Sequence, residues 1–380
     1  MHEHKHNQCK RKVKHRKNVM KLIIFCITVG ISLMFIYYQN LRKEIDARQK
    51  WLETVLTGEK KWILENQGPE GEFYMNGSKA GDVNPYFACM AALGLLAETK
   101  NCLITETEKK AVNRYLDWHT GILLETDGKM GIYRKESGKL IYKEKADSED
   151  GYLGMYLFLM GKYLEKTEST DLSEYWKKGI SLALKKIQSL MQDGITQVSG
   201  ENTTVYLMDN LEVWKGLYEL EHAGLKDVQA IREMRNKLQA QIEKLFWDDA
   251  NQRWRIIENS NLYHQKEFYP DGVAQIYPLI YEFPVKEKKK QKILYKQFTE
   301  RFQWQKLNKK RNGFLWAMAG MAAAQMGDIN NLLEMIRNYE AEYCENRKYP
   351  LYTGEAGWIC MECEKLYSLY ERKIKTGFLV

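Results

Sequence analysis

Gly81-Asp82-Val83-Asn84-Pro85-Tyr86 is the stretch that decides the fold, because five later stretches repeat its pattern. In each of them, a loop containing Asp, Glu or Asn runs directly into an apolar, aromatic-rich helical segment. The later stretches are residues 147–152, 206–210, 269–272, 312–316 and 353–358. The first four are about 60 residues apart and the last three about 43, roughly the length of a helical hairpin with its connections. This repetition predicts six similar hairpins, with the polar starts of their inner helices gathered around one groove.

Two kinds of helix alternate after residue 42. One kind is long and amphipathic, as in residues 174–180, and the other is short and apolar on all sides, as in residues 87–94. A helix that is apolar all round is buried, whereas an amphipathic helix covers it. We therefore expect an all-α (α/α)6 toroid with six inner and six outer helices, preceded by one transmembrane helix. The twelve helices are expected at about 44–66, 84–98, 105–119, 148–166, 172–192, 207–223, 226–246, 271–282, 286–304, 313–326, 328–344 and 355–373.

Two interruptions of this pattern predict short strands. Residues 130–134 and 139–143 flank Glu136-Ser137-Gly138 and are typical of a β-hairpin. Residues 247–257 predict a turn that leads into another short strand. Both interruptions lie between an outer and an inner helix, where loops would shape the groove.

The positive charge of the chain is concentrated at its N-terminus. Residues 1–21 hold eight Lys or Arg and one acid, so the other 359 residues carry only about +1 of the net charge of +8. Basicity confined to a tail argues against a nucleic-acid-binding body. Residues 22–38 follow as an uncharged apolar run of 17, about the shortest length that spans a bilayer.

This arrangement predicts a membrane anchor at residues 22–38 with the basic tail, residues 1–21, in the cytoplasm. Residues 39–380 would then form an extracytoplasmic domain, and the lipid bilayer would be a partner of the chain. No small-residue cleavage site follows the apolar run, which favours an uncleaved anchor over a removed signal peptide. A buried core helix is the alternative, but the flanking charge disfavours it.

The cysteines give little indication of chemistry. Five lie after the apolar run, so at least one of them stays unpaired. Cys360 and Cys363 form a C-x-x-C that is compatible with a redox or metal pair, but no second pair and no histidine lies nearby. Packing as small apolar residues is the simpler interpretation, and we expect no metal and no cofactor.

Several segments resemble the six-hairpin glycosidases over about residues 50–375. They are the turn Leu245-Phe246-Trp247-Asp248 before a short strand, residues 206–210 and residues 269–275. The nearest branch is glycoside hydrolase family 8, whose members cut β-linked glucans, xylans and chitosan. The resemblance implies a hydrolase that acts on a polysaccharide or oligosaccharide with inversion.

The resemblance also suggests roles for individual residues. The family places its acid, a Glu, at the start of the first inner helix, where this chain has Asp82-Val83-Asn84 and no Glu. Its sugar-binding motif is similar to residues 147–150, which assigns Asp150 to the sugar at the cleavage point. Its base resembles Asp271 in Pro270-Asp271-Gly272, although the Arg that follows in the family is absent here.

Glycoside hydrolysis requires one protonated carboxyl group and one carboxylate. We therefore expect Asp271 to be the base and Glu72 or Asp82 to be the acid. Asp150 and Asp209 would bind the sugar, together with aromatic side chains on which sugar rings stack: Tyr86, Tyr152, Tyr206, Tyr269, Trp316 and Trp358. The alternative for each acid is structural, since Asp and Asn cap helices and acids are stabilised in a first helical turn.

Two other functions remain open. A glycan-binding or assembly protein without activity would fit the missing Glu and Arg of the family pattern. A polysaccharide lyase or sugar epimerase on the same toroid would need a His or Tyr base in the groove, for which His264 is the convenient histidine. The acids of the groove argue against the basic lining that a lyase for acidic glycans would need.

Overall fold

The structure, a computed structural model, describes residues 2–77, 81–136, 139–169, 172–258, 267–307 and 313–376, with side chains from residue 20 to residue 375. The chain divides into two compact units, Met1–Leu52 with Arg372–Val380, and Glu53–Glu371. Within the described residues there are twelve α-helices, which confirms the predicted number and the all-α class.

The first helix, α1, runs without interruption from His2 to Glu65, so the predicted anchor and the first outer helix are one element. Among the described residues, one helix, Met20–Glu65, is long and apolar enough to cross a membrane, with a mean hydropathy of 2.2 in its most apolar window. Length and composition are the only grounds for this statement, and a signal sequence near the N-terminus has the same properties.

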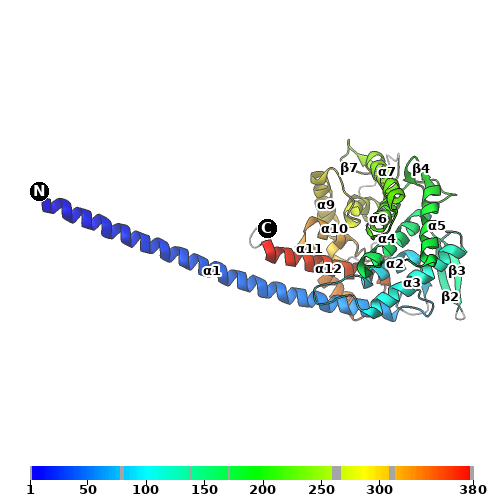
Figure 1. Cartoon of the computed structure of the whole chain (residues 1–380), viewed down its shortest axis with the longest axis horizontal. Helices are drawn as coiled ribbons and strands as arrows, with labels where there is room; N and C mark the ends of the chain where they lie inside the picture. The colour runs from blue at the N-terminus through cyan, green and yellow to red at the C-terminus, as the bar shows by residue number, and fades with distance from the viewer. Residues whose placement is uncertain are drawn as a thin grey trace. The chain divides into compact units, whose positions relative to one another are not determined.

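The inner helices are α2 (Pro85–Leu95), α4 (Glu149–Thr167), α6 (Leu207–His222), α8 (Val273–Ile280), α10 (Ala319–Met326) and α12 (Thr353–Thr376). The outer helices are the end of α1, α3 (Glu106–Glu125), α5 (Glu174–Leu190), α7 (Gln229–Phe246), α9 (Lys288–Phe302) and α11 (Ile329–Tyr339). Successive inner helices from α2 to α10 contact one another, and α3, α5, α7, α9 and α11 each contact the preceding inner helix. Figure 1 shows α4 and α6 inside this unit, with α5 and α7 on their outer sides.

The helix α12 closes the inner ring. It contacts α10 where Glu362 lies against Gly320, and it contacts α2 where Gly357 lies against Gly94. These contacts complete the predicted (α/α)6 toroid.

Gly357 permits the closest of these approaches. A Cβ atom on Gly357 would lie 2.1 Å from the carbonyl oxygen of Met90, and backbone atoms cannot give way as a side chain can. Gly357→Ala should therefore lower the free energy of unfolding by at least about 2 kcal/mol. Gly58→Ala is the matched control, because a Cβ there meets nothing within 4 Å and alanine favours a helix by about 1 kcal/mol. Denaturant unfolding of both variants measures the difference; equal stability would contradict this account of ring closure.

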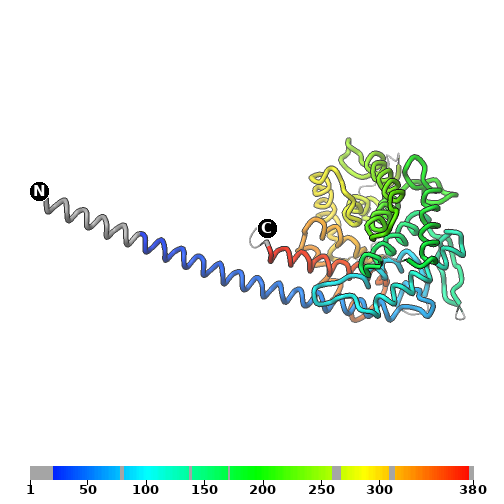
Figure 2. Tube along the Cα trace, viewed as in Figure 1, coloured from blue at the N-terminus to red at the C-terminus, as the bar shows by residue number. Residues whose placement is uncertain are grey.

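Short strands border the toroid. The predicted hairpin is β2 (Gly131–Glu136) and β3 (Lys139–Lys145), and β1 (Asp82–Val83) pairs with β2 to give a three-stranded sheet. The strand predicted after the 247 turn is β7 (Arg253–Trp254), which pairs with β6 (Trp247–Asp248). A further pair joins β4 (Met191–Gln192) to β5 (Ile195–Thr196). Figure 2 traces the hairpin at the periphery of this unit.

The start of α10 differs from the prediction, because this helix begins at Ala319 and not at 313. Gly313 and Trp316 have φ angles of 76° and 59°, so the backbone is left-handed at both residues and cannot be helical there. Short irregular turns complete the description: η1 (Phe268–Gly272), η2 (Trp304–Lys306) and η3 (Glu340–Cys344).

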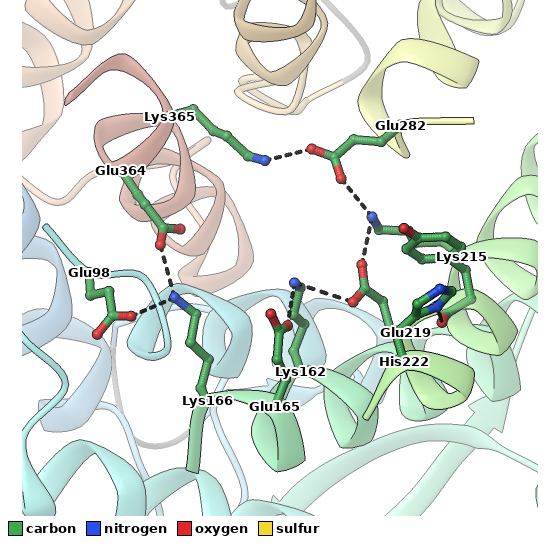
Figure 3. A network of polar contacts seen from close by, with 11 residues as sticks. Glu98, Lys162, Glu165, Lys166, Lys215, Glu219, His222, Glu282, Glu364 and Lys365 are labelled. Carbon is green, nitrogen blue, oxygen red and sulfur yellow. Dashed lines mark hydrogen bonds and ion pairs between the residues drawn. The ribbon is translucent and has the colours of Figure 1, made fainter. Parts of the chain in front are cut away.

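Ion pairs connect the C-terminal parts of the inner helices. Lys215 of α6 is buried and contacts Glu219 at 2.7 Å and Glu282, after α8, at 2.9 Å. Lys365 of α12 reaches the other oxygen of Glu282 at 2.5 Å, and Lys166 of α4 contacts Glu98 and Glu364. Figure 3 shows this network, which links four inner helices. Such ion pairs are weak evidence for stability, because the cost of removing charges from water offsets much of their attraction.

Candidate active site

A cavity of about 590 Å³ lies at the opposite ends of the inner helices, where their N-termini meet. All six inner hairpin starts contribute to its wall, as the repeated loop-to-helix pattern predicts. Its lining includes Asp82, Tyr86, Asp147, Tyr152, Asp209, Glu212, Tyr269, Tyr277, Phe314, Trp316, Glu355 and Trp358. The wall is therefore both acidic and aromatic.

Glu212 is the most deeply placed carboxyl group whose environment suggests acid–base chemistry. It lies inside α6, and only 3% of its surface is exposed. Its Oε1 atom accepts hydrogen bonds from the hydroxyl groups of Tyr86 of α2, Tyr277 of α8 at 2.6 Å and Tyr281 at 3.4 Å. Three tyrosines from two other inner helices thus fix one oxygen of this carboxyl group.

Burial, with a smaller contribution from the charges of Asp150 and Asp147, raises the pKa of Glu212 to about 7, and the hydrogen bonds from Tyr277 and Tyr86 oppose this change. The other oxygen, Oε2, lies against Gly151 at the start of α4, where a Cβ atom would approach it to 2.6 Å. A carboxyl group with a pKa near neutrality is suited to donate a proton at physiological pH.

Asp209 lies one helical turn before Glu212, so both side chains emerge on the same face of α6. Asp209 lines the cavity, and α6 has no side-chain cap, so Asp209 does not have the capping role considered for it. Burial and the charges of Asp150 and Glu212 raise the pKa of Asp209 well above its ordinary value. The charges of Asp150 and Glu212 therefore disfavour ionisation of Asp209.

Asp147 and Asp150 flank Ser148, which caps α4 through the N–H of Gly151. Asp147 is exposed and lines the cavity, whereas Asp150 is buried and does not. The oxygens of Asp150 accept hydrogen bonds from Ser148 at 2.8 Å, Gly151 at 3.0 Å and Thr196 at 2.7 Å. Burial raises the pKa of Asp150 to about 6 against these hydrogen bonds. Asp150 holds the start of α4 next to β5 and contacts the cavity only through its neighbours.

The two residues predicted as the acid have different positions. Asp82 lines the cavity but is paired with Arg134 at 2.7 Å and with Lys143 at 2.7 Å. These contacts, the Arg134 hydrogen bond above all, lower the pKa of Asp82, so a proton is less available there. Glu72 is fully buried, accepts hydrogen bonds from Tyr74 and from the N–H of Glu70, and is not part of the cavity wall.

The predicted base, Asp271, lies in η1 and lines another cavity, of about 690 Å³, together with Gly272, Gln275 and residues of β7 and α9. The structure therefore does not bring Asp271 together with Asp82, Asp209 and the start of α4. Gln275 holds this region by bonding the backbone N–H and C=O of Trp254 at 2.9 Å each.

Five of the six predicted aromatic residues line the first cavity: Tyr86, Tyr152, Tyr269, Trp316 and Trp358. Tyr206 does not, since it precedes α6 and pairs with Ile257. Tyr269 and Trp316 pack against each other with ring centroids 4.8 Å apart, and 39% of Tyr269 is exposed.

Glu355, at the start of α12, is a second buried carboxyl group in the wall. It accepts the backbone N–H groups of Trp316 at 3.1 Å and Ala317 at 2.9 Å. Burial raises the pKa of Glu355 to about 7, although these N–H groups favour the charged form. Both of its oxygens are engaged by the loop before α10, so its evident role is to hold that loop.

Sequence reasoning missed Glu212, Tyr277 and Tyr281, and it named Tyr86 only as a ring on which a sugar stacks. The available signal was the spacing of Asp209 and Glu212, three residues apart in the first turns of a helix whose start is mostly buried. An acidic side chain inside a buried helix needs hydrogen-bond or charge partners, because burying an unpaired charge is costly. An acid on an exposed face needs no such partner.

The raised pKa of Glu212 has a consequence for stability. Between pH 4.5 and about 7 the folded protein keeps a proton on Glu212 that the unfolded chain has released, so stability falls as pH rises through this window. Glu212→Gln cannot lose that proton and should be more stable than the natural chain at pH 8, by on the order of 3 kcal/mol at most.

Thermal unfolding at pH 5 and pH 8 measures this effect, with the exposed Glu345→Gln as control. The melting temperature of Glu212→Gln should exceed that of the natural chain by more at pH 8 than at pH 5. A difference in melting temperature that is constant over this range would contradict the raised pKa of Glu212. In Glu212→Gln, Glu355 and Asp150 still have raised pKa values. The pH dependence of its stability should therefore be smaller than that of the natural chain, but it should not vanish.

The described residues contain no group of three or more His, Cys, Asp and Glu that is arranged to hold a metal ion. Cys360 and Cys363 are both free and buried. His119 is buried against Tyr115 and Tyr156, where burial lowers its pKa to about 3. His222 stacks on Tyr218 near the ion-pair network. His264, the histidine considered for a lyase or epimerase, lies outside the described residues.

Comparison with solved structures identifies the architecture. A glycosidase variant superposes with a TM-score of 0.62 at 12% identity, covering 85% of this chain and 98% of that one. The fold is that of the six-hairpin glycosidases. An inactive GH76 α-1,6-mannanase variant of Salegentibacter, in complex with α-1,6-mannotetrose, gives 0.55 at 10% identity over 84% and 99% of the chains. A D-mannose isomerase gives 0.56 at 12% identity over 84% and 97%.

These identities establish the fold and nothing finer. No family model matches the sequence, and no curated protein matches it either. Both hydrolases and an isomerase occur on this fold, so the function has to be argued from the cavity itself.

Proposed function

We propose that the protein is a glycoside hydrolase that cleaves a polysaccharide in the cavity at the N-terminal ends of α2, α4 and α6. The observation that carries the proposal is Glu212, a buried carboxyl group in the cavity wall with a pKa of about 7, held by three tyrosines. The aromatic wall and the glycosidases of the same fold support a sugar as the substrate.

Glu212 is proposed as the general acid. At neutral pH a carboxyl group with this pKa is protonated in a substantial fraction of molecules, so it can protonate the oxygen of the leaving sugar. The tyrosine hydroxyl groups stabilise the carboxylate that remains after Glu212 has lost its proton, because hydrogen bonds to a charged acceptor are stronger than those to a neutral one. The oxygen that faces Gly151 is the one left for the proton.

Asp147 is proposed as the base. It lines the same cavity, is exposed to solvent, and its charge contributes to the raised pKa of Glu212. Because it is exposed, the Asp147 carboxylate can bind the attacking water. Asp209, which lines the same cavity, would bind a sugar hydroxyl group.

Inversion and the placement of the enzyme within glycoside hydrolase family 8 remain proposals that come from the sequence resemblance. The membrane anchor at residues 22–38 is proposed on the basis of the long apolar helix, the basic tail before it and the length of that apolar run. The hydrolase domain, residues 39–380, would then act outside the cytoplasm on a polysaccharide near the cell surface.

The experiment is an assay of the full-length protein, solubilised in detergent, on barley β-glucan, xylan, chitosan and α-1,6-mannan. We expect new reducing ends from at least one polymer, with nuclear magnetic resonance of the first product showing the inverted anomer. Binding without any new reducing ends would favour the inactive glycan-binding protein, and neither binding nor cleavage would refute a glycan substrate from this panel.

A further inference from the structure

A row of aromatic rings leads from the cavity wall to the protein surface. Trp316 and Phe314 line the cavity, and their ring centroids are 6.0 Å apart. Tyr352 follows at 5.5 Å from Phe314, and Tyr349 at 6.1 Å from Tyr352. Neither of these last two residues lines the cavity. We call Phe314, Tyr352 and Tyr349 the aromatic strip.

The outer end of the strip is exposed but held in place. Tyr349 is 69% exposed, more than any other large hydrophobic side chain in the described residues of the toroid. Its hydroxyl group rests on Gly313, where a Cβ atom would come within 2.5 Å of it. Phe314 stacks on Phe87 of α2 with centroids 5.5 Å apart and a 13° angle between the rings. An exposed ring on a fixed support is a platform for a ligand face.

The hairpin side of the cavity has a different character. Asp82, Arg134 and Lys143 satisfy one another there, and Lys145 is paired with Glu149 and Glu201. These charges are engaged in ion pairs, so that side offers a chain of sugars fewer free contacts than the aromatic strip. The strip begins at Phe314, next to Trp316 in the cavity wall, and so gives a direct route from the cavity outwards.

We propose that the aromatic strip is a second binding surface for the polysaccharide, on which sugar rings outside the cavity stack against Tyr352 and Tyr349. The inference rests on the proposed function and deepens it. The substrate is then a polymer that continues beyond the cavity, and the enzyme distinguishes long chains from short ones by contacts remote from the reacting bond.

The test is Tyr349→Ala in the full-length detergent-solubilised protein, with Tyr175→Ala as the matched control. Tyr175 is 42% exposed on the outer helix α5 and is not part of the cavity wall. The probes are the polymer of the panel that the natural chain cleaves and a ladder of oligosaccharides prepared from it. Gel retardation by all four polymers measures binding without catalysis.

Tyr349→Ala should raise KM for the polymer roughly fivefold with kcat unchanged, and the effect should disappear for the shortest oligosaccharides cleaved. Loss of a merely structural contact would change all chain lengths equally. If Tyr349→Ala and Tyr175→Ala both match the natural chain on the polymer, the strip is not a binding surface.

Binding and cleavage separate the two proposals. A polymer that retards the natural chain and Tyr175→Ala but not Tyr349→Ala supports the strip even if nothing is cleaved, which would contradict only the hydrolase. Cleavage with no dependence on Tyr349 contradicts only the strip. The absence of both retardation and cleavage across the four polymers contradicts both.

Discussion

Glu212→Gln is expected to lower kcat by about 10³-fold, because glutamine cannot protonate the leaving oxygen. Glutamine keeps the size of the side chain and an oxygen that the hydroxyl groups of Tyr86, Tyr277 and Tyr281 can still reach. Substrate binding should therefore persist, and KM should change little. Initial rates of reducing-end release measure kcat and KM on the polymer that the natural chain cleaves.

Glu72→Gln is the control for this variant. Glu72 is also a buried glutamate and also accepts a tyrosine hydroxyl group, but it does not line the cavity. Its replacement should leave kcat within a few-fold of the natural value. The opposite result, a large loss for Glu72→Gln and none for Glu212→Gln, would return the acid to Glu72, one of the two residues that the sequence suggests.

Asp147→Asn is expected to reduce kcat by about 10²-fold, because the asparagine amide cannot take a proton from the attacking water. Asp147 is exposed and lies in a loop, so the fold should tolerate the change and the melting temperature should stay close to that of the natural chain. Rates and thermal unfolding are measured on the same preparation, so that lost activity is not confused with lost structure.

Two further variants are compared with Asp147→Asn. Asp82→Asn removes an acid that also lines the cavity but is engaged by Arg134 and Lys143, and Asp271→Asn removes the base suggested by the family resemblance. Both should retain more activity than Asp147→Asn. If Asp271→Asn shows the largest loss of the three, the base lies at the second cavity and our assignment of Asp147 is wrong.

The fold could be predicted from the sequence because its signals are local and repeated. Buried inner helices such as α2 are apolar on every side, and outer helices such as α5 are amphipathic, so the alternation is visible without any contact information. The start of α10 could not be predicted, because it depends on the left-handed backbone of Trp316, in a loop whose N–H groups bond to Glu355, 39 residues away along the chain.

The candidate site could be predicted only where its residues stand at the repeated loop-to-helix junctions, as Asp82 and Asp209 do. Glu212 gives no such signal, since its meaning comes from Tyr86 and Tyr277, which are 126 and 65 residues away along the chain. Burial and those hydroxyl groups appear only when α2, α6 and α8 are brought together. Asp271 shows the opposite: its motif is conspicuous in the sequence, but in the structure it lines a different cavity from Glu212.

Mass spectrometry of products formed in ¹⁸O-labelled water tests the central claim most directly. The full-length natural chain and Glu212→Gln are compared on the same four polymers. We predict that the natural chain incorporates one ¹⁸O atom into each new reducing end and that Glu212→Gln releases almost no product. Products that lack the added water, as a lyase would give, or equal cleavage by both proteins, would contradict the account.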